Sequence, residues 1–488
     1  MSYFERVTPE SVGISSNKVL EFLERCKKKG LQLHSFMFVR DGKVFAETWF
    51  RPYNKESKHS MFSFTKSLTS TAIGFAVQEG KVDLSDKLVD IFPEHLPDEV
   101  SENLAKVTVR DVLIMGGGHT REPGVHGEDW IKKWLSFPFE HEPGTYFAYN
   151  SSGTNMLCAI LKKKTGENMT DYLYERLFKK IGMGKVPCSQ TADGIDAGGG
   201  GSKLTTEQMA LFIQFVMNKG KWENEQLLNS EWFDAALSKQ IDTKHSNSIP
   251  DWYLGYGYQF WMCQPEGVVR ADGAFGQFGI MYPDKNAFFV IQGSSTNNFE
   301  VLQAVWDTFI GAFKDEPLPE DKEANIILNY VLKNNEILPL QSKRVYNSMK
   351  KYAKLRYAPV DELKGGAEAI IGGYTDEAED KSIKEIKLDF IGNECIFSVN
   401  TCCGQEKIKI SLESHFNIFD LNGRTYGAVG SWESDSEFTF LIYCAEAPNG
   451  NQVTIKFNDT CLTISTKSTY PEGGWHRREV KDLVFNLI

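Results

Sequence analysis

The sequence lacks an apolar run long enough to cross a membrane, and it lacks an excess of positive charge. Its 54 Lys and Arg residues are outnumbered by 65 Asp and Glu residues, which gives a net charge of −11. No basic stripe is visible, so we expect neither a nucleic-acid partner nor a membrane partner. The first residues show no charged segment followed by an apolar one, so we expect no signal peptide and a cytoplasmic protein.

Paired cysteine motifs are also missing. The nine cysteines are odd in number and scattered, and none of them forms C-x-x-C. Reduced thiols in a cytosolic protein are the simplest interpretation. The adjacent Cys402 and Cys403 could be redox-active, although we favour an ordinary position at the end of a strand.

Common hydrolase motifs are absent as well. No serine stands in G-x-S-x-G, which disfavours a Ser-His-Asp hydrolase. The nine histidines are dispersed without H-x-H or H-E-x-x-H, so we expect no metal and no organic cofactor. The glycine-rich stretch 198–203 lacks the spacing of a phosphate-binding loop, and we interpret it as a tight loop that walls a cleft.

The length of 488 residues exceeds one ordinary hydrophobic core, so more than one domain is expected. The composition changes near residue 315, where an acidic stretch contains two prolines. After residue 368, short segments with alternating polarity dominate. We therefore predict a first domain over 1–315, a linker and helical segment over 316–367, and a C-terminal β-barrel or sandwich over 368–488.

A Ser-x-x-Lys motif, Ser63 to Lys66, begins a run with helical spacing that ends at Gly80. The spacing places both side chains on one face of the helix. A serine is a poor nucleophile until a base takes its proton, and a neutral lysine can be that base. Catalytic lysines have pKa values of roughly 7–8 instead of about 10.4. Alone the motif is weak, because the serine could simply cap a helix whose lysine points to water.

Further signals follow in the chain. A hairpin over 34–50 and segments 255–262, 272–281 and 286–293 predict a five-stranded antiparallel sheet with helices packed on it. Glycines in 272–281 mark places where another backbone or a ligand could approach. His119 follows a glycine run, and we interpret it either as a residue at the rim of a cleft or as a loop histidine that bonds the backbone.

Three motifs stand in a diagnostic order: Ser63-x-x-Lys66, then Tyr149-Asn150-Ser151, then Asp272-Gly273-Ala274. This order resembles the serine β-lactamase and penicillin-binding protein superfamily, and within it the class C β-lactamase-related esterases, D-aminopeptidases and amide-oligomer hydrolases. The resemblance covers about residues 5–312. It implies an α/β fold, with an antiparallel sheet flanked by helices, a helical insert and a site between them, followed here by a small all-β domain.

The resemblance also implies roles for individual residues. Ser63 would be the acylated nucleophile and Lys66 its base partner, and Tyr149 would activate Ser63 and then the hydrolytic water. The backbone N–H groups of Ser63 and Phe275 would form the oxyanion hole. The substrate-binding residues would be Ser151, Asp272, Gly273, Ala274 and His119.

Two positions depart from the usual motifs. The second motif usually reads Tyr-x-Asn, where this chain has Ser151, and the third usually begins with Lys or His, where this chain has Asp272. An acid weakens the case for binding a β-lactam carboxylate, so we expect cleavage of a small ester, amide or peptide through an acyl-enzyme on Ser63. The alternatives are a β-lactamase or D-amino-acid peptidase proper, and a non-catalytic ligand-binding protein on the same fold. Loops such as 117–128 and 194–203 are expected to shape the pocket.

Overall fold

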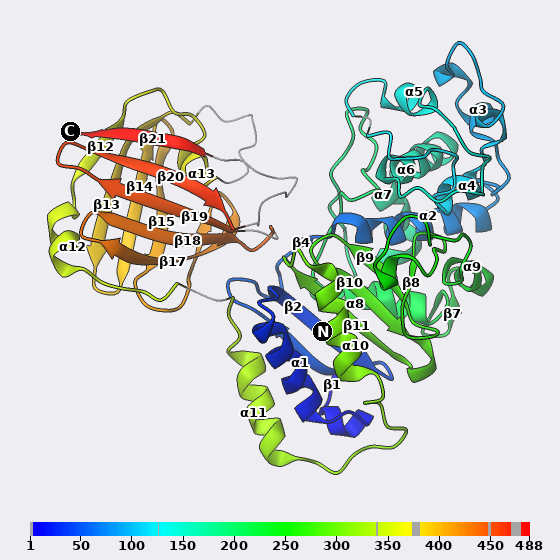
Figure 1. Cartoon of the computed structure of the whole chain (residues 1–488), viewed down its shortest axis with the longest axis horizontal. Coiled ribbons are helices and arrows are strands. Elements are labelled where there is room, and N and C mark those ends of the chain that lie inside the picture. Colours follow the sequence, from blue (N-terminus) through cyan, green and yellow to red (C-terminus); the bar gives the residue numbers. More distant parts are fainter. Residues whose placement is uncertain (1–2, 125, 338–339, 373–380, 448–449, 470–479) are drawn as a thin grey trace. The chain divides into compact units, whose positions relative to one another are not determined.

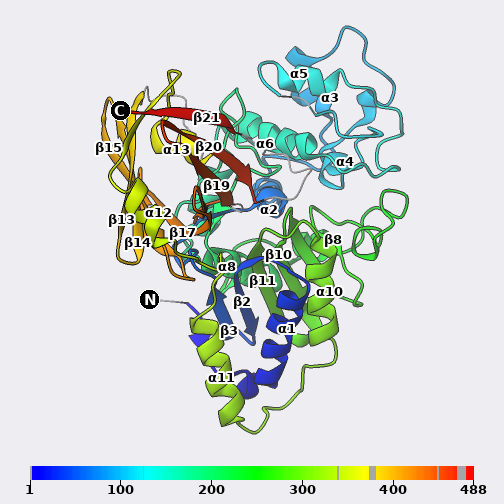
Figure 2. The same cartoon turned by 60° about the vertical axis from the view of Figure 1, so that its left-hand side comes forward.

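The chain forms two compact units, which Figures 1 and 2 show in two views. The computed structural model describes residues 3–124, 126–337, 340–372, 381–447, 450–469 and 480–488. The first unit comprises Met1–Thr48 and Lys58–Lys333, and the second comprises Trp49–Ser57 and Asn334–Ile488. In the part of the chain that the structure describes, every helix is too short or too polar to span a membrane.

This division differs from the boundaries that the sequence predicted. Helix α11 (Lys322–Lys333) packs against α1 (Ser16–Lys28), so residues beyond 315 still belong to the first unit. The segment Trp49–Ser57 leaves the first unit and joins the second. An apolar cluster around Tyr53 accounts for this assignment, since its other members come from the C-terminal part of the chain.

The first unit is built on a seven-stranded sheet with the order β1–β3–β2–β11–β10–β9–β8. Its strand pairs are antiparallel, apart from the parallel pair β1–β3. The five-stranded prediction missed β1 and treated 272–281 as one strand. The chain instead turns back there, because Phe275 and Gly276 have φ values of +67° and +90°. The strands are β1 (Glu5–Arg6), β2 (Leu33–Arg40), β3 (Lys43–Trp49), β8 (Trp261–Met262), β9 (Val269–Gly273), β10 (Gln277–Tyr282) and β11 (Ala287–Gly293).

Both faces of the sheet are covered by helices. Phe36 and Phe38 alternate with Met37 along β2, so they point to the opposite face. The two phenylalanine rings pack against Phe22 of α1, and Phe38 also contacts Phe309 of α10. Met37 lies in the core of the other face, against which α8 packs. Figures 1 and 2 show α1 and α10 together on their side of the sheet.

Helix α2 is the buried centre of the first unit, and it contacts α6 and α7 of the helical insert. Local capping fixes where the insert helices begin. The Thr108 hydroxyl and the Asp111 carboxylate form a capping box at α4, and Asn150 Oδ1 accepts the N–H of Gly153 at α6. The other helices are α2 (Thr65–Gln78), α3 (Leu88–Ile91), α4 (Val109–Leu113), α5 (Trp130–Leu135), α6 (Ser151–Thr165), α7 (Met169–Leu173), α8 (Thr206–Met217), α9 (Ser230–Ala236) and α10 (Asn298–Phe309).

The second unit is a closed β-barrel, which decides between the two all-β architectures that were predicted. Ten strands follow the order β15–β14–β13–β12–β21–β20–β19–β18–β17–β16, and a pairing of Ser411 with Val429 joins β15 to β17. Cys402 and Cys403 lie at the exposed turn after β14, with their sulfur atoms 3.5 Å apart. The elements are α12 (Tyr346–Tyr352), β12 (Arg356–Pro359), α13 (Gly366–Ile371), β13 (Ile383–Ile391), β14 (Glu394–Thr401), β15 (Gly404–Ser411), β16 (Asn417–Leu421), β17 (Arg424–Ser434), β18 (Glu437–Cys444), β19 (Gly450–Phe457), β20 (Cys461–Ser468) and β21 (Val480–Leu487).

Candidate active site

Ser63 lies in a single helical turn, Phe62–Phe64, that runs directly into α2. The preceding residue, Phe62, has a φ of +47°, so the backbone bends sharply before the serine. The strand β4 (His59–Ser60) pairs with β5 (Lys203–Leu204) and holds the approach to this turn. The N–H groups at the start of a helix lack intrahelical acceptors, so the Ser63 segment presents hydrogen-bond donors at its beginning.

The amine of Lys66 is surrounded by three oxygen atoms. Lys66 Nζ lies 3.0 Å from Ser63 Oγ, 3.0 Å from Ser151 Oγ and 2.5 Å from the carbonyl oxygen of Gly199. An ammonium group has three donors, and these contacts would use all three. A neutral amine has two donors and one lone pair, so it can serve Gly199 and Ser151 and still accept the proton of Ser63. The cluster therefore satisfies Lys66 in both protonation states.

Burial brings the pKa of Lys66 into the range of a base. The side chain is 1% exposed, and this desolvation lowers its pKa from 10.5 to about 7. The negative charges of Glu122 and Asp272 oppose the decrease. At neutral pH a large fraction of Lys66 is therefore unprotonated beside the Ser63 hydroxyl.

Tyr149 lies against the same two residues. Ser63 lowers the pKa of the Tyr149 hydroxyl, and the tyrosine ring centroid is 4.9 Å from Lys66 Nζ. Trp261 stacks on the tyrosine ring, with centroids 5.8 Å apart. Burial raises the pKa of Tyr149 well above its ordinary value, and Ser63 only partly offsets this increase. At neutral pH Tyr149 is therefore a neutral phenol that can donate or pass on a proton.

The structure accounts for the unusual second motif. Asn150 does not point to Lys66; its side chain caps α6 and accepts the N–H of Gly153 and the hydroxyl of Ser152. Ser151 supplies the contact to Lys66 Nζ. A serine at this position thus keeps an oxygen next to the lysine, although the usual asparagine is absent.

The third motif lies directly against the nucleophile segment. A Cβ atom on Gly273 would lie 2.3 Å from the carbonyl oxygen of Met61 and 3.1 Å from the N atom of Phe64, so only glycine fits. Beyond the strand, Phe275 has a left-handed backbone with φ of +67°, and its ring contacts that of Phe62 at 5.1 Å. The end of β9 and the turn before α2 therefore approach each other closely at Ser63.

Asp272, in place of the usual cation, is paired with a buried arginine on its own strand. Residues two apart on a strand share a face, and Arg270 lies 2.8 Å from Asp272 Oδ2. Asp251 is a second carboxylate beside Arg270, at 4.0 Å, and Trp252 stacks below the guanidinium. Burial raises the pKa of Asp272, and Arg270 offsets part of that increase. The carboxylate of Asp272 is therefore already paired with a cation of the protein itself, the guanidinium of Arg270.

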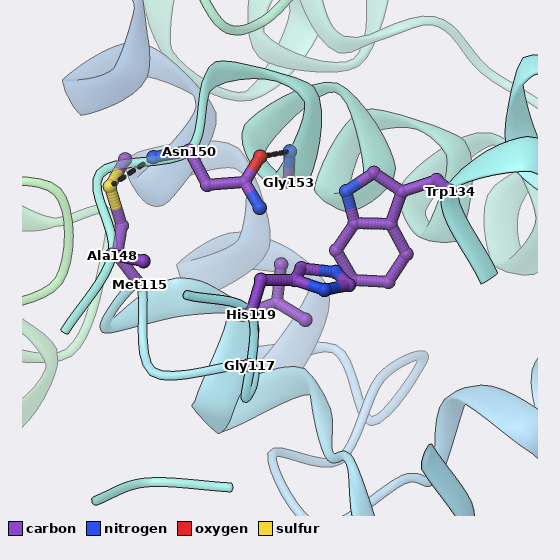
Figure 3. Close-up of a pocket in the computed structure, with 8 residues that line it drawn as sticks. Met115, Gly117, His119, Trp134, Ala148, Asn150 and Gly153 are labelled. Atoms are coloured by element: carbon purple, nitrogen blue, oxygen red, sulfur yellow. Dashed lines mark hydrogen bonds between the residues drawn. The ribbon is translucent and has the colours of Figure 1, made fainter. Parts of the chain in front are cut away.

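His119 matches the second of its two interpretations, a loop histidine that bonds the backbone. It is 2% exposed, its Nδ1 atom lies 3.0 Å from the carbonyl oxygen of Pro138, and its ring packs against Trp134 and Phe139. Figure 3 shows it in a small cavity beside Asn150. The volume open to the centre of a water molecule there is about 10 Å³, which is room for a single water. A direct role of His119 in binding a substrate stays a prediction.

Sequence reasoning missed several residues of this cluster. Glu122 binds the first N–H groups of α6, Gly199 accepts from Lys66, and Arg270 holds Asp272. The two loops that contain Glu122 and Gly199 were expected to shape the pocket, but no spacing identifies the residues in them. The i, i+2 placement of Arg270 and Asp272 on a strand is a sequence signal for this pair, because residues two apart share a face.

Comparison with known proteins agrees with this geometry. A family model described as Beta-lactamase matches residues 21–306, which is more than half of the chain. The chain belongs to the beta-lactamase family. The predicted superfamily, the predicted α/β fold and the additional β domain are thereby confirmed.

Individual relatives of this beta-lactamase-family chain are distant. A 6-aminohexanoate-dimer hydrolase of Paenarthrobacter ureafaciens is 22% identical over 273 residues, which is 50% of this chain and 68% of that protein. A solved structure named as a candidate 6-aminohexanoate-dimer hydrolase from Bacillus anthracis has a TM-score of 0.51 and 19% identity, covering 66% of this chain and 89% of that one. A candidate beta-lactamase from Bacteroides dorei DSM 17855 has a TM-score of 0.50 and 16% identity, covering 60% and 99%. These solved structures support the fold alone.

Proposed function

We propose that this protein is a serine hydrolase that cleaves an ester or amide bond through an acyl-enzyme on Ser63. The observation that carries the proposal is the contact between Lys66 Nζ and Ser63 Oγ at 3.0 Å, with the pKa of that lysine lowered to about 7. A serine becomes a nucleophile when a positioned base takes its proton. Lys66 lies within hydrogen-bond distance of Ser63, and its lowered pKa suits it to accept that proton.

In the acylation step, Ser63 Oγ attacks the carbonyl carbon of the substrate while its proton passes to neutral Lys66. The carbonyl π electrons move to the oxygen, where the N–H groups of Ser63 and Phe275 would stabilise the negative charge. The tetrahedral intermediate then collapses, and the bond to the leaving group breaks. Tyr149, a neutral phenol at the serine, donates a proton to the departing oxygen or nitrogen and regains one from Lys66.

Deacylation uses the same groups with water as the nucleophile. The water attacks the acyl carbonyl, and neutral Lys66 takes a proton from this water, either directly or through Tyr149. The bond to Ser63 Oγ breaks, and the serine regains its proton. Hydrogen bonds from Lys66 to Gly199 and Ser151 keep the amine in place during both steps.

The charges near the serine favour substrates without a carboxylate at the position of the third motif. Asp272 and Glu122 both act electrostatically on Lys66, and Arg270 is already committed to Asp272. A β-lactam carboxylate would meet a carboxylate where the family usually offers a cation. We therefore favour a neutral or amine-bearing ester or amide at this position, and the named relative makes the 6-aminohexanoate dimer the first compound to screen.

Covalent labelling tests the proposal. The purified protein is treated with a fluorophosphonate, and separately with a penicillin, and the intact mass is measured. We expect one phosphonate adduct, formed by a bond from Ser63 Oγ to phosphorus with loss of fluoride, and no penicillin adduct. Ser63→Ala should lose the phosphonate adduct, whereas Ser136→Ala, at an exposed serine, should keep it.

The other outcomes each identify an alternative. A penicillin adduct that disappears in Ser63→Ala would move the assignment to a penicillin-recognising enzyme. Failure of the phosphonate to label wild-type Ser63 would overturn the proposal in favour of a non-catalytic ligand-binding protein.

A further inference from the structure

Glu122 joins a loop of the helical insert to the beginning of α6. Its Oε2 atom accepts the N–H of Ser151 at 2.6 Å, and its Oε1 atom accepts the N–H of Ser152 at 2.7 Å. Hydrogen bonds from N–H groups to a carboxylate are among the strong ones in proteins. A negative charge also suits the positive end of the α6 dipole. Both oxygens of Glu122 are therefore committed to the backbone of one short segment.

That segment carries much of the proposed machinery. Ser151 is the first residue of α6 and places its Oγ atom 3.0 Å from Lys66 Nζ, and Tyr149 lies two residues before it. Asn150, between them, already holds the N–H of Gly153. Glu122 adds the bonds to the two N–H groups that Asn150 does not reach. The start of α6 is thus fixed at three successive N–H groups.

The charge of Glu122 also acts on the residues around Ser63. It opposes the lowering by burial of the pKa of Lys66 and of His119, and it adds to the increase that burial causes in the pKa of Tyr149. Among the described residues, the other charge that acts on Lys66 is that of Asp272 on β9, which is paired with Arg270. The charge of Glu122 therefore affects the pKa of Lys66, although no bond is described between the two side chains.

We propose that Glu122 is a positioning residue, which orients Ser151 against Lys66 through the α6 backbone and places a negative charge near this base. This inference rests on the proposed hydrolase function. It adds a carboxylate, from a loop outside the three motifs, to the groups that control the reaction. The role is indirect, because Glu122 contacts the backbone of α6 and not the reacting atoms.

Two substitutions separate the charge of Glu122 from its hydrogen bonds. Glu122→Gln removes the charge but keeps the size, and its amide can accept only one of the two N–H groups. Glu122→Asp keeps the charge but is one methylene shorter, so it loses reach. The matched control is Glu128→Gln, which removes the same charge from an exposed residue of the same loop.

The pH dependence of kcat/KM on an ester substrate is the main readout. In Glu122→Gln we expect the acid limb to move to lower pH by roughly half a unit to one unit, because a carboxylate that stabilises the ammonium form is gone. The plateau should fall about tenfold or more as Ser151 and Tyr149 lose their fixed positions. Glu122→Asp should keep the limb at the wild-type pH with a lower plateau, and Glu128→Gln should match the wild type.

A second readout does not depend on turnover. The titration of Lys66 Nζ can be followed by NMR of protein labelled with ¹⁵N-lysine, with Lys66→Arg to identify the signal. It should move to lower pH in Glu122→Gln but not in Glu128→Gln. Failure of the hydrolase proposal would appear as absent phosphonate labelling of wild-type Ser63, whereas failure of this inference would appear in the titration.

Several results would overturn the inference. An unchanged Lys66 titration in Glu122→Gln would remove the electrostatic role, and so would a shift of equal size in Glu128→Gln. If the acid limb of the kcat/KM profile also moves in Glu122→Asp, the geometry of residue 122 and not its charge determines the midpoint of that limb. If Glu122→Gln does not fold, Glu122→Asp alone still decides, because a wild-type plateau in that variant contradicts the positioning role.

Discussion

The carbonyl oxygen of Gly199 lies 2.5 Å from Lys66 Nζ. A carbonyl oxygen can only accept, so one N–H of Lys66 is committed to Gly199 whether the amine is charged or neutral. In the neutral amine the lone pair must then face one of the two serine hydroxyls, Ser63 or Ser151, that lie 3.0 Å away. The glycine-rich loop therefore constrains the proposed base, because it leaves only the two serine hydroxyls for the lone pair and the second N–H of the neutral amine.

Replacing Lys66 by arginine should abolish the proposed chemistry while keeping the positive charge. A guanidinium does not lose its proton in proteins, so it cannot accept the proton of Ser63. We expect the rate of phosphonate labelling of Ser63 and kcat/KM on an ester to fall by about 10²–10⁴. A variant that retained more than a tenth of the wild-type rate would show that Lys66 is not the base.

The activity should rise with pH through a midpoint near 7. The pKa of Lys66 is lowered by burial to about 7, and the base form is the unprotonated one. Below the midpoint the ammonium form dominates and the rate should drop about tenfold for each pH unit, whereas above it the rate should level off. The measurement is kcat/KM of the wild type between pH 5 and 9. A flat profile, or a midpoint near the ordinary lysine value, would contradict the assignment.

Gly273→Ala should disturb the nucleophile although it adds only a methyl group. The new Cβ atom would lie 2.3 Å from the carbonyl oxygen of Met61, so β9 or the turn before α2 must move. We expect a loss of about 1–3 kcal/mol in the free energy of unfolding and a clear fall in the labelling rate of Ser63. Gly117→Ala is the control, since its nearest neighbour, Trp134, would be 4.0 Å away. Equal effects of the two variants would argue against the close approach.

Asp272→Asn should lower the free energy of unfolding of the first unit more than a matched substitution at an exposed aspartate does. It leaves the buried Arg270 with Asp251, at 4.0 Å, as its remaining described carboxylate. Removing one partner of a buried ion pair typically costs about 3–5 kcal/mol. We expect about 3 kcal/mol by denaturant unfolding, with less than about 0.5 kcal/mol for the exposed control Asp284→Asn. A neutral effect at Asp272 would show that Asp251 alone compensates Arg270.

Tyr53→Ala should destabilise the C-terminal unit, although Tyr53 lies ten residues before Ser63 in the chain. Its ring is 3% exposed, and its hydroxyl donates to the carbonyl oxygen of Ala447 at 2.7 Å. Loss of a buried aromatic ring typically costs about 3–5 kcal/mol. Calorimetry of the full chain should show the transition of the C-terminal unit at a lower temperature. Tyr346→Ala, at a tyrosine that is 70% exposed, should leave both transitions in place.

Much of the fold was predictable because it is encoded locally. The Ser63–Lys66 spacing places two side chains on one helical face, and Thr108 caps α4 as its sequence indicates. The hairpin of β2 and β3 follows from the Asp41-Gly42 turn signal. The prediction was wrong at 272–281, because glycines within an alternating run are equally compatible with a strand and with the hairpin that Phe275 and Gly276 form.

The sequence by itself determined the family, the order of the three motifs and the side chains that face one another within a helix or strand. Only the tertiary structure decided that Gly199 and Glu122 belong to the site, because each reaches it from a loop without periodicity, and Gly199 from 133 residues away. The tertiary structure also decided the proton affinity of Lys66, since its pKa depends on burial by parts of the chain that are distant in sequence. A motif specifies which groups are available, whereas their environment sets the chemistry that they can perform.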